Sequence, residues 1–432
     1  MDAHIKFETA PYKVAERIKK MRPSAVRLLF AAATRDDVIS LAGGMPDVSL
    51  LPKSAVRKAA RAALEAQSVS LQYGGTNGVF STAAVFCDIV RDVGIRHKPE
   101  NVIITTGAQE ALDLVAKTFC DPGDIVITEG PTYLGALQAF SAYEPDIRTI
   151  PFDDQGMRMD LLEAELERIG KGNPKLKFCY TIPNFQNPGG VTMSPERRKR
   201  LLELSHEYDF IVVEDDPYGR LRYEGGHCLP MRALDDSVIY LGTISKMFAA
   251  GLRVGWIMAP PGVIAKINLA KQGTDLCGSV FDQIMAAAYF TDTPWQNTLQ
   301  KFVKTYDKRR RAMLDALDEF FPPEATWTHP EGGFFVWATL PQYVDANSML
   351  AEALDHGVVY APGDAFFPDG KRGRNSMRLN FSYESPENIR EAIRRLAEVI
   401  EDRLELYRAF IAAGALPGVE QSDESKGTAP SD

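Results

Sequence analysis

Residues 210–219 of the chain, Phe-Ile-Val-Val-Glu-Asp-Asp-Pro-Tyr-Gly, have the pattern of a buried strand that ends in polar, chemically active residues. Four apolar residues are followed directly by Glu214, Asp215 and Asp216, and then by Tyr218. A continuous apolar run of this length is typical of a strand covered on both faces of a parallel sheet. Two interpretations of the acids stay open at this point: an acidic turn or helix cap, or a carboxylate directed at a cationic group of a ligand.

Further apolar runs on both sides of this segment alternate with helical patterns. The predicted strands of the whole set are 102–105, 125–128, 147–151, 178–182, 210–213, 238–241 and 254–258. The helical patterns include 107–119, 159–169 and 194–208. Ser194 is a suitable N-cap for the last of these, with Pro195 as its first helical residue. The alternation predicts an α/β fold with one large, seven-stranded, mostly parallel sheet and helices on both faces.

The pattern changes after about residue 295. A long amphipathic helix is predicted at 298–320 and another from 386 to about 409, with three short apolar runs between them at 334–340, 358–360 and 377–381. This order predicts a smaller α+β domain. We therefore predict a large domain at 46–295 and a small domain formed by 1–45 together with 296–412. The polar residues 413–432 are predicted to be a disordered tail.

Composition limits the classes of function. The 432 residues exceed the usual size of a single hydrophobic core, about 250–300 residues. A net charge of −9 without a long Lys/Arg run argues against nucleic acid or an anionic membrane as partner. The five cysteines and six histidines are dispersed, which predicts reduced thiols and no metal site. Neither a signal peptide nor a transmembrane run is recognisable, so a cytoplasmic protein acting on small molecules is expected.

Two more predicted strands end in residues that suit ligand binding. The run 238–253 passes from apolar residues through Thr243 and Ser245 to Lys246, and Arg253 opens the next strand. A solvated loop lysine is one interpretation, and an amine nucleophile beside an anion site is the other. In the run 102–110, Gly107 follows the predicted strand and leads directly into a helix, whose free N–H groups and dipole favour a phosphate.

One cofactor accounts for all three strand ends. Ligands of open α/β sheets bind at the carboxyl ends of the strands. Pyridoxal 5'-phosphate (PLP) needs a lysine for covalent attachment, a carboxylate for its ring nitrogen, and donors for its phosphate. Lys246 and Asp215 meet the first two needs, and the phosphate donors would be Ala108, Gln109, Ser245 and Arg253. The glycine motifs of nicotinamide-binding and P-loop proteins are not found in the sequence.

The sequence also resembles the class I/II aminotransferases of PLP fold type I, and within them the subgroup of kynurenine/2-aminoadipate aminotransferases. The resemblance extends from about Ser24 to Ala397 and rests on an ordered set of motifs. These are Ile39-Ser-Leu-Ala-Gly-Gly-Met-Pro46, Leu71-Gln-Tyr-Gly-Gly-Thr-Asn-Gly78, Pro183-Asn-Phe-Gln-Asn-Pro-Gly-Gly190, Glu214-Asp-Asp-Pro-Tyr-Gly219, Gly242-Thr-Ile-Ser-Lys246 through Arg253, and Met377-Arg-Leu-Asn-Phe-Ser382.

The resemblance implies a role for each matching residue. Lys246 would be the Schiff-base lysine and Asp215 the partner of the pyridinium nitrogen. Tyr218 and Asn187 would hold the phenolic oxygen of PLP, and Tyr133 would stack on its ring. The phosphate would be held by Ala108, Gln109, Ser245, Arg253 and, from a partner subunit, Tyr73. The substrate would be contacted by Arg378, which binds its α-carboxylate, and by Asn187, Tyr73, Tyr133, Gly44 and Arg27. Ala108 stands where the family often has Ser or Gly, so it offers only its backbone N–H.

Simpler interpretations exist for some of these residues. Tyr133 could be an ordinary core aromatic, and Asn187-Pro188 is good turn chemistry without a ligand. Arg27 could form a solvated or interface ion pair.

The resemblance implies an aminotransferase (EC 2.6.1) that works as a homodimer with shared active sites. It would move an amino group from an L-amino acid of the 2-aminoadipate, aromatic or branched/aliphatic type to a 2-oxo acid such as 2-oxoglutarate, by ping-pong kinetics through pyridoxamine phosphate. Other PLP reactions (β-lyase, decarboxylase or oxidase) would use nearly the same residues. An aminotransferase-like regulatory protein is a further alternative, although no basic DNA-binding module precedes the first motif in this sequence.

Overall fold

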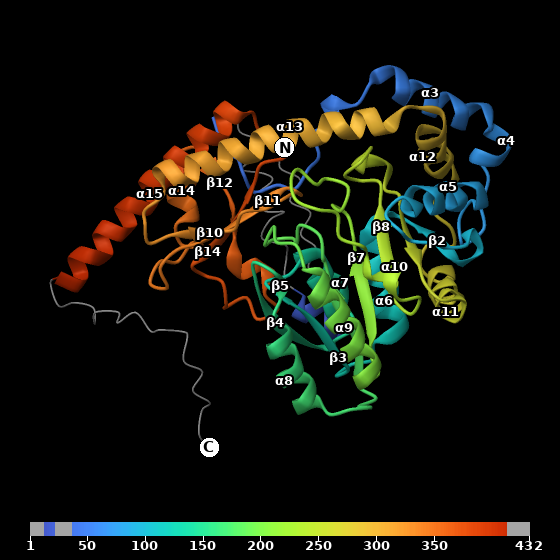
Figure 1. Ribbon diagram of the computed structural model, residues 1–432, viewed down its shortest axis with the longest axis horizontal. Helices are drawn as coiled ribbons and strands as arrows, with labels where there is room; N and C mark the ends of the chain where they lie inside the picture. Colours follow the sequence, from blue (N-terminus) through green and yellow to red (C-terminus); the bar gives the residue numbers. More distant parts are fainter. Residues whose placement is uncertain (1–12, 22–36, 413–432) are drawn as a thin grey trace.

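The computed structural model describes residues 13–21 and 37–412 of the chain, and Figure 1 shows its arrangement. Two larger β-sheets organise these residues, an eight-stranded one and a four-stranded one. Arg27 and the predicted disordered tail at 413–432 lie outside the described residues.

The eight-stranded sheet contains all seven strands predicted from the sequence. In spatial order it consists of β2 (Val102–Thr105), β9 (Gly255–Met258), β8 (Ile239–Thr243), β7 (Ile211–Asp215), β6 (Leu176–Thr181), β3 (Ile125–Gly130), β4 (Asp146–Asp153) and β5 (Gly156–Met157). The fold class is confirmed, but the sheet has eight strands instead of seven. The additional strand, β5, has two residues, too few to produce a periodic pattern.

Strand direction determines which residues meet at one edge of this sheet. Strands β8, β7, β6, β3 and β4 are parallel to one another, whereas β9 is antiparallel to both of its neighbours, β2 and β8. The pairs Thr105↔Gly255 and Thr243↔Gly255 therefore bring the start of β9 to the carboxyl ends of β2 and β8. This is the edge at which ligands bind in open α/β sheets.

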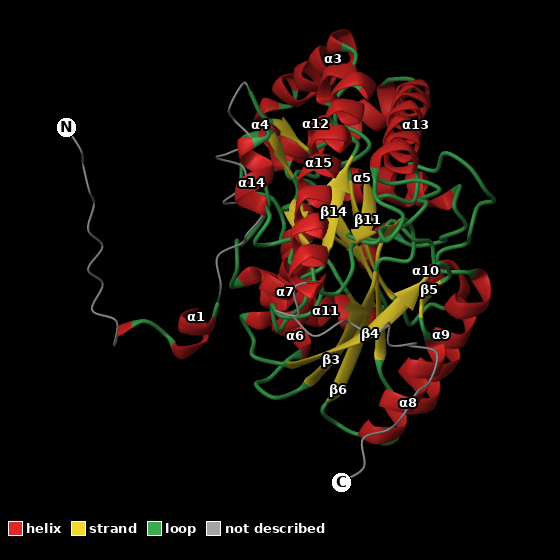
Figure 2. Ribbon diagram, turned by 90° about the vertical axis from the view of Figure 1, so that its left-hand side faces the viewer, coloured by secondary structure: helices red, strands yellow, loops and turns green. Residues whose placement is uncertain are grey.

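Helices cover both faces of the large sheet, as the unbroken apolar strands require (Figure 2). Helices α6 (Gly107–Phe119), α7 (Leu134–Ser141) and α11 (Pro261–Gln272) lie on one face, where α6, α7 and α11 contribute buried residues to one hydrophobic cluster. The other face is covered by α3 (Lys53–Glu65), α5 (Phe80–Arg91) and α12 (Val280–Asp292) toward β2, and by α8 (Met159–Ile169) and α9 (Pro195–Tyr208) toward β4.

The smaller sheet is antiparallel and has its own hydrophobic cluster. Its strands are β10 (Thr326–Trp327), β11 (Phe335–Thr339), β14 (Ser376–Asn380) and β13 (Ala361–Pro362). The long helices α13 (Trp295–Phe320) and α15 (Pro386–Ala412) pack against each other beside it (Figure 1). The predicted run at 358–360 does not join the small sheet. Its strand β12 (Val358–Val359) pairs in parallel with β1 (Ile39–Ser40), and β13, which joins the small sheet, begins directly after the run.

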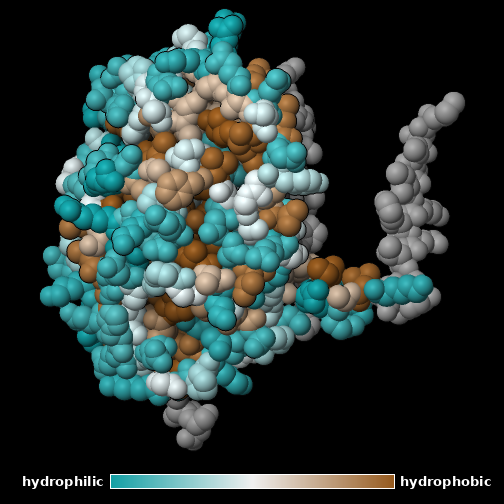
Figure 3. Space-filling view, turned by 90° about the vertical axis from the view of Figure 1, so that its right-hand side faces the viewer, coloured by the Kyte–Doolittle hydropathy of each residue, from teal (hydrophilic) through white to brown (hydrophobic). Residues whose placement is uncertain are grey.

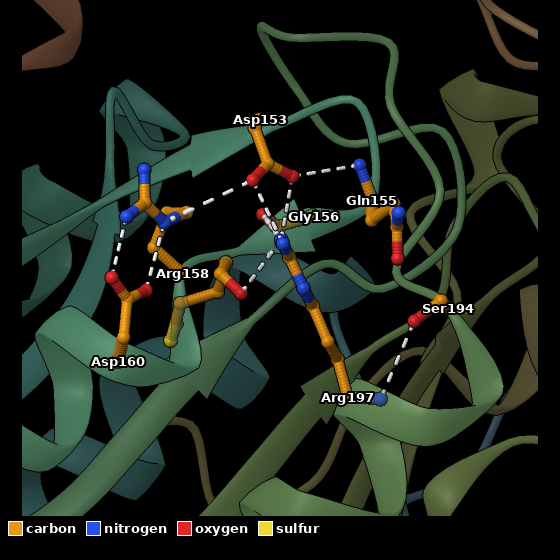
Figure 4. Close-up of polar contacts among 8 residues, drawn as sticks. Asp153, Gln155, Gly156, Arg158, Asp160, Ser194 and Arg197 are labelled. Carbon is orange, nitrogen blue, oxygen red and sulfur yellow. Dashed lines mark hydrogen bonds and ion pairs between the residues drawn. The ribbon is translucent and has the colours of Figure 1, made fainter. Parts of the chain in front are cut away.

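A polar clamp ties the start of α9 to the turn between β4 and β5 (Figure 4). The guanidinium of Arg197 donates two hydrogen bonds to the carboxylate of Asp153, at 2.6 and 2.7 Å, and one each to the carbonyls of Gly156 and Met157. Ser194 caps the helix by accepting from the N–H of Arg197, as its sequence position predicts. The loop between β6 and α9 is thereby anchored at its far end.

Among the described residues, no helix is both long and apolar enough to cross a bilayer. All five cysteines are free thiols, of which Cys87, Cys120 and Cys179 are buried and the other two are partly buried.

Candidate active site

A cavity of about 510 Å³ lies at the carboxyl edge of the large sheet, between the two sheets. All the site residues predicted from the sequence line it except Tyr73 and Arg27. They are Gly44, Ala108, Gln109, Tyr133, Asn187, Asp215, Tyr218, Ser245, Lys246, Arg253 and Arg378. Residues from seven different segments of the chain therefore meet in one place.

The three acids at the end of β7 have three different environments. Glu214 accepts from the backbone N–H groups of Met231 and Arg232 and so caps the short helix α10 (Met231–Leu234). Asp216 accepts from Asn184, the N–H of Gly219 and the hydroxyl of Tyr240. The cap and turn interpretation is therefore correct for these two acids, and only Asp215 lines the cavity.

Asp215 is a buried carboxyl group with one oxygen left without a partner. It is 2% exposed, and its Oδ2 accepts from the hydroxyl of Tyr180 at 2.8 Å. Its Oδ1 has no hydrogen-bond partner among the described residues. Burial raises the pKa of Asp215 to about 7. A cation or a cationic N–H placed at Oδ1 would favour the ionised form, because an opposite charge stabilises a carboxylate.

Lys246 follows β8 and extends its amine into the same cavity. Its Nζ donates to the carbonyl of Gly44 at 2.6 Å and lies 5.3 Å from the ring centre of Phe334 and 5.9 Å from that of Tyr218. Burial and the positive charges of Arg378 and Arg253 lower the pKa of Lys246 to about 7. A neutral amine is the form that acts as nucleophile or base, so this lysine is prepared for both tasks at neutral pH.

One corner of the cavity is suited to an anion. The helix α6 begins at Gly107, so the N–H groups of Ala108 and Gln109 belong to its first turn and the positive end of its dipole faces this corner. Gly107 has a φ of +72°, and a side chain there would collide with the guanidinium of Arg253. Arg253 and Ser245 complete the set of donors, with Ser245 hydrogen-bonded to Thr243 at 2.9 Å.

Arg378 supplies a second positive charge, from the small sheet. It lies on β14, is 3% exposed, and its guanidinium is 4.2 Å from the ring centre of Phe335. It donates to Asn187 Oδ1 at 3.0 Å and to the carbonyls of Ala42 and Gly43. Burial lowers the pKa of Arg378 to about 10. No carboxylate of the described residues forms an ion pair with it, and its Nε has no partner. A buried cation without a counter-charge is suited to bind an anionic ligand group.

Two tyrosines complete the wall. Tyr133 precedes α7, and its hydroxyl donates to Gln109 Oε1 at 3.3 Å. Tyr218 is 4% exposed and packs edge-on against Phe334 and Phe335. Burial raises the pKa of Tyr218, and the nearby charge of Arg378 opposes that rise.

Two predicted site residues do not join the cavity. Tyr73 is 81% exposed and lies after α4 (Gln67–Ser70), on the outside of the molecule. Arg27 lies outside the described residues. The cavity also contains residues that the sequence analysis did not select, among them Thr243, Phe335, Leu134 and Gln138. Thr243 could have been found, because it ends β8 two residues before the predicted Ser245.

Comparison with known proteins identifies the family. Residues 36–396 match the family model of class I and II aminotransferases. The chain belongs to this family. It is similar to aromatic-amino-acid aminotransferase 1 of Thermococcus litoralis, with 46% identity over 90% of this chain and 94% of that protein. As a class I/II aminotransferase, it is a PLP-dependent transaminase of the subgroup that includes aromatic-amino-acid, 2-aminoadipate and kynurenine aminotransferases.

Solved structures of related aminotransferases agree in fold and cofactor. The kynurenine aminotransferase of Pyrococcus horikoshii, in complex with PMP, kynurenine and product, is 45% identical, with a TM-score of 0.88 over 92% of this chain and 99% of that one. The alpha-aminoadipate aminotransferase of Thermus thermophilus, complexed with N-(5'-phosphopyridoxyl)-L-leucine, is 36% identical, with a TM-score of 0.83 over 91% of this chain and 98% of that one.

The cavity of this aminotransferase fits the cofactor of its family. PLP carries an aldehyde, a basic ring nitrogen and a phosphate, and bound PLP withdraws electrons from the substrate's Cα. The cavity holds an amine with a lowered pKa, a buried carboxyl whose Oδ1 is unpartnered, and a helix N-terminus beside Arg253. Each chemical feature of the cofactor thus has a complementary group in the cavity. Among the described residues, no cluster of His, Cys, Asp or Glu is arranged to hold a metal ion.

Proposed function

We propose that this transaminase transfers the amino group of an aromatic, 2-aminoadipate-type or aliphatic L-amino acid to 2-oxoglutarate, with Lys246 as the covalent attachment point and proton carrier. The observation that carries the proposal is the meeting of three groups in one cavity. These are the Lys246 amine with its pKa lowered to about 7, the unpartnered Oδ1 of Asp215, and the Arg378 cation without a counter-charge.

Each residue would have a separate task. Asp215 would hold a proton on the ring nitrogen of PLP, and Tyr218 and Asn187 would donate to its phenolic oxygen. Tyr133 would contact the ring face. The N–H groups of Ala108 and Gln109 would bind the phosphate, together with Ser245 and Arg253. Once released by the substrate, the amine of Lys246 would carry the proton from the substrate's Cα. Arg378 would bind the α-carboxylate, and Gly44 and Arg27 would complete the substrate site.

The proposal includes two domains that move relative to each other, 46–295 and 1–45 with 296–412. The pairing of β1 with β12 and the separate hydrophobic cluster of the small sheet support this division. Arg378 belongs to the small sheet, whereas Asp215 ends strand β7 of the large one and Lys246 follows its strand β8. A substrate that contacts both would favour closure, which excludes water from the reacting carbon.

A donor and acceptor panel tests the function. Purified protein with PLP is incubated with each of the twenty amino acids and 2-aminoadipate, with 2-oxoglutarate or pyruvate as acceptor, and both products are quantified. Transfer predicts stoichiometric formation of the oxo acid and the new amino acid, with parallel-line ping-pong kinetics. Release of ammonia, carbon dioxide or hydrogen peroxide without a new amino acid would indicate a lyase, decarboxylase or oxidase instead.

Arg378→Lys tests the proposed carboxylate site. A lysine is a point charge and cannot make the two parallel N–H bonds that a guanidinium makes to a carboxylate. Loss of such a charged hydrogen bond, about 1.5–3 kcal/mol, corresponds to a rise in KM of roughly 10- to 100-fold. We expect this rise for every amino acid and oxo acid, with PLP still bound. A defect limited to acidic substrates would mean that Arg378 contacts the side chain and that another residue, such as Arg27, binds the α-carboxylate.

The proposal further includes a homodimer in which Tyr73 reaches the phosphate of the partner subunit. Tyr73 does not line the cavity of its own chain. Three apolar residues near it in sequence are also strongly exposed: Val69 (56%), Leu71 (69%) and Phe80 (61%). Figure 3 shows the side of the molecule where α4 lies, with hydrophobic residues exposed among hydrophilic ones. Exposed apolar patches of this kind mark interfaces between proteins.

Tyr73→Phe is expected to weaken retention of PLP while the protein stays a dimer. The change removes one hydroxyl donor, which for a phosphate is worth roughly tenfold in affinity. Equilibrium dialysis of PLP and sedimentation velocity measure the two properties separately. A monomeric protein, or unchanged affinity for PLP in the variant, would reject the shared site.

A cytoplasmic location is also part of the proposal, and the five free thiols support a reducing compartment.

A further inference from the structure

Tyr180 is a buried residue of β6 that the preceding roles do not use. It is fully buried, and its hydroxyl donates to Asp215 Oδ2 at 2.8 Å. In the register of the sheet, Tyr180 lies opposite Val213, two residues before Asp215 on the neighbouring strand β7. Residues two apart on a strand share a face, so the tyrosine side chain approaches the carboxylate along the face that the two strands share.

The three acids differ in the number of hydrogen-bond donors that they have, and Asp215 has the fewest. Glu214 has two backbone donors, and Asp216 has three donors. Asp215 has one donor among the described residues, the hydroxyl of Tyr180. Its orientation in the cavity wall therefore depends on a single side chain, and its second oxygen, Oδ1, remains available.

The ring of Tyr180 is itself held in place. It packs edge-on against Phe140 of α7, with ring centres 5.4 Å apart and an interplanar angle of 82°. Phe140 also packs against Phe178, the residue two before Tyr180 on the same strand. Because these rings belong to one buried hydrophobic cluster, the hydroxyl has a defined position from which to orient the carboxylate.

We propose that Tyr180 is a positioning residue that binds Oδ2 of Asp215, keeps this carboxylate ionised, and directs Oδ1 toward the ring nitrogen of the cofactor. The inference rests on the proposed function of Asp215. A hydrogen bond to the charged form of a carboxyl group favours that form, and burial opposes it. Without the hydroxyl, Oδ2 would be a buried acceptor with no partner, and Asp215 could rotate or take up a proton.

The test compares Tyr180→Phe with a matched control, Tyr240→Phe. Tyr240 is 3% exposed and donates its hydroxyl to Asp216 Oδ2 at 3.1 Å, so the control removes the same atom from an equally buried tyrosine beside the adjacent acid. Each holoenzyme is prepared with PLP labelled with ¹⁵N in the ring. The measurements are the ¹⁵N chemical shift of the bound ring, which reports whether its nitrogen is protonated, and the single-turnover rate with a good amino donor.

We expect Tyr180→Phe to move the ¹⁵N signal toward that of a neutral pyridine and to slow the single turnover by roughly 10- to 100-fold, the range for one hydrogen bond to a charged group. Tyr240→Phe should leave the signal in place and the rate within about threefold. Replacement of Tyr180 by p-aminophenylalanine, which keeps a ring and an N–H donor, should restore both readouts and remains informative if Tyr180→Phe folds poorly.

Two results would overturn the inference. One is a wild-type ¹⁵N shift and rate in Tyr180→Phe. The other is an equal loss of rate in both tyrosine variants with no change in the ¹⁵N shift, since that would be a packing effect. A wild-type protein that binds PLP but transfers no amino group would reject the proposed function itself, and it is recognised before any variant is compared.

Discussion

Lys246→Ala is expected to retain PLP without a covalent link and to lose transamination by at least about four orders of magnitude, the upper range of general acid–base catalysis alone. The loss follows from the position of this amine. It is the only lysine that lines the cavity within the described residues, and burial together with Arg378 and Arg253 lowers its pKa to about 7. Alanine supplies neither a nucleophile nor a base, while the proposed phosphate donors stay in place.

Borohydride reduction followed by peptide mapping checks the assignment. In the wild-type protein the reduced adduct should be found on Lys246, and in Lys246→Ala no adduct should form. Lys271→Ala is not a suitable control, because Lys271 is fully buried in ion pairs with Glu110 and Asp275. The exposed Lys58 is suitable, and Lys58→Ala should leave the adduct and the activity unchanged. An adduct on any other lysine would contradict the proposed role.

The lowered pKa of Lys246 also predicts a pH dependence. The neutral amine is the reactive form, and its fraction rises as the pH increases through the pKa. The rate at which the apoprotein becomes covalently linked to added PLP should therefore increase through about pH 7 and level off above it. A lysine with its ordinary pKa of 10.5 would give a rate that still increases between pH 8.5 and 10. Stopped-flow absorbance of the linked cofactor distinguishes the two profiles.

Asp215→Asn has the second largest expected effect, a loss in turnover of about a thousandfold, which corresponds to roughly 4 kcal/mol. The amide has nearly the shape of the carboxylate but no negative charge, so it cannot hold a proton on the ring nitrogen of PLP. Without that proton the cofactor withdraws electrons poorly from the substrate. Steady-state kinetics and the ¹⁵N shift of the labelled cofactor measure the two aspects.

Asp216→Asn is the matched control because its carboxylate is adjacent in sequence but bound differently. Its oxygens accept from Asn184, Gly219 and Tyr240, so we expect a loss of about 1–3 kcal/mol in the free energy of unfolding. Turnover per folded molecule should stay within a few-fold of the wild-type value. If Asp216→Asn impaired turnover more than Asp215→Asn did, the assignment of the two acids would be wrong.

The tertiary structure explains why Asp215, rather than either neighbouring acid, faces the cavity. The sequence shows three carboxylates in a row, and the alternation of a strand separates Asp215 from its two neighbours only once the covered face is known. In the structure, Asp215 is the acid of the three that lines the cavity. Glu214 caps α10, a helix 17 residues further along the chain, which no local pattern indicates. Asp216 stabilises the turn that directly follows it, by accepting from the N–H of Gly219.

Tyr180 was missed for a related reason. Within the predicted strand 178–182 it has the appearance of a core aromatic, and its packing against Phe140 agrees with that. The role of its hydroxyl can be recognised only from the register between β6 and β7, which places the hydroxyl beside Asp215. Register depends on how whole strands pair, so it is not contained in the apolar pattern of one strand.

The main strands and helices, and the edge at which the site lies, could be predicted from the sequence. Runs of four or five residues predicted the strands of a sheet that is covered on both faces, and ligands of such sheets bind at the carboxyl ends of the strands. A strand and its carboxyl end can both be recognised from consecutive residues of the sequence. Residues that follow a predicted strand end, such as Asp215, Lys246 and Ala108, could therefore be selected from sequence. The pKa values of the site residues, in contrast, follow only from the tertiary structure. The pKa of Lys246 depends on burial and on Arg378, which the small sheet places across the cavity. These two residues are 132 positions apart in the sequence, so their proximity follows from the packing of the two sheets and not from any local pattern.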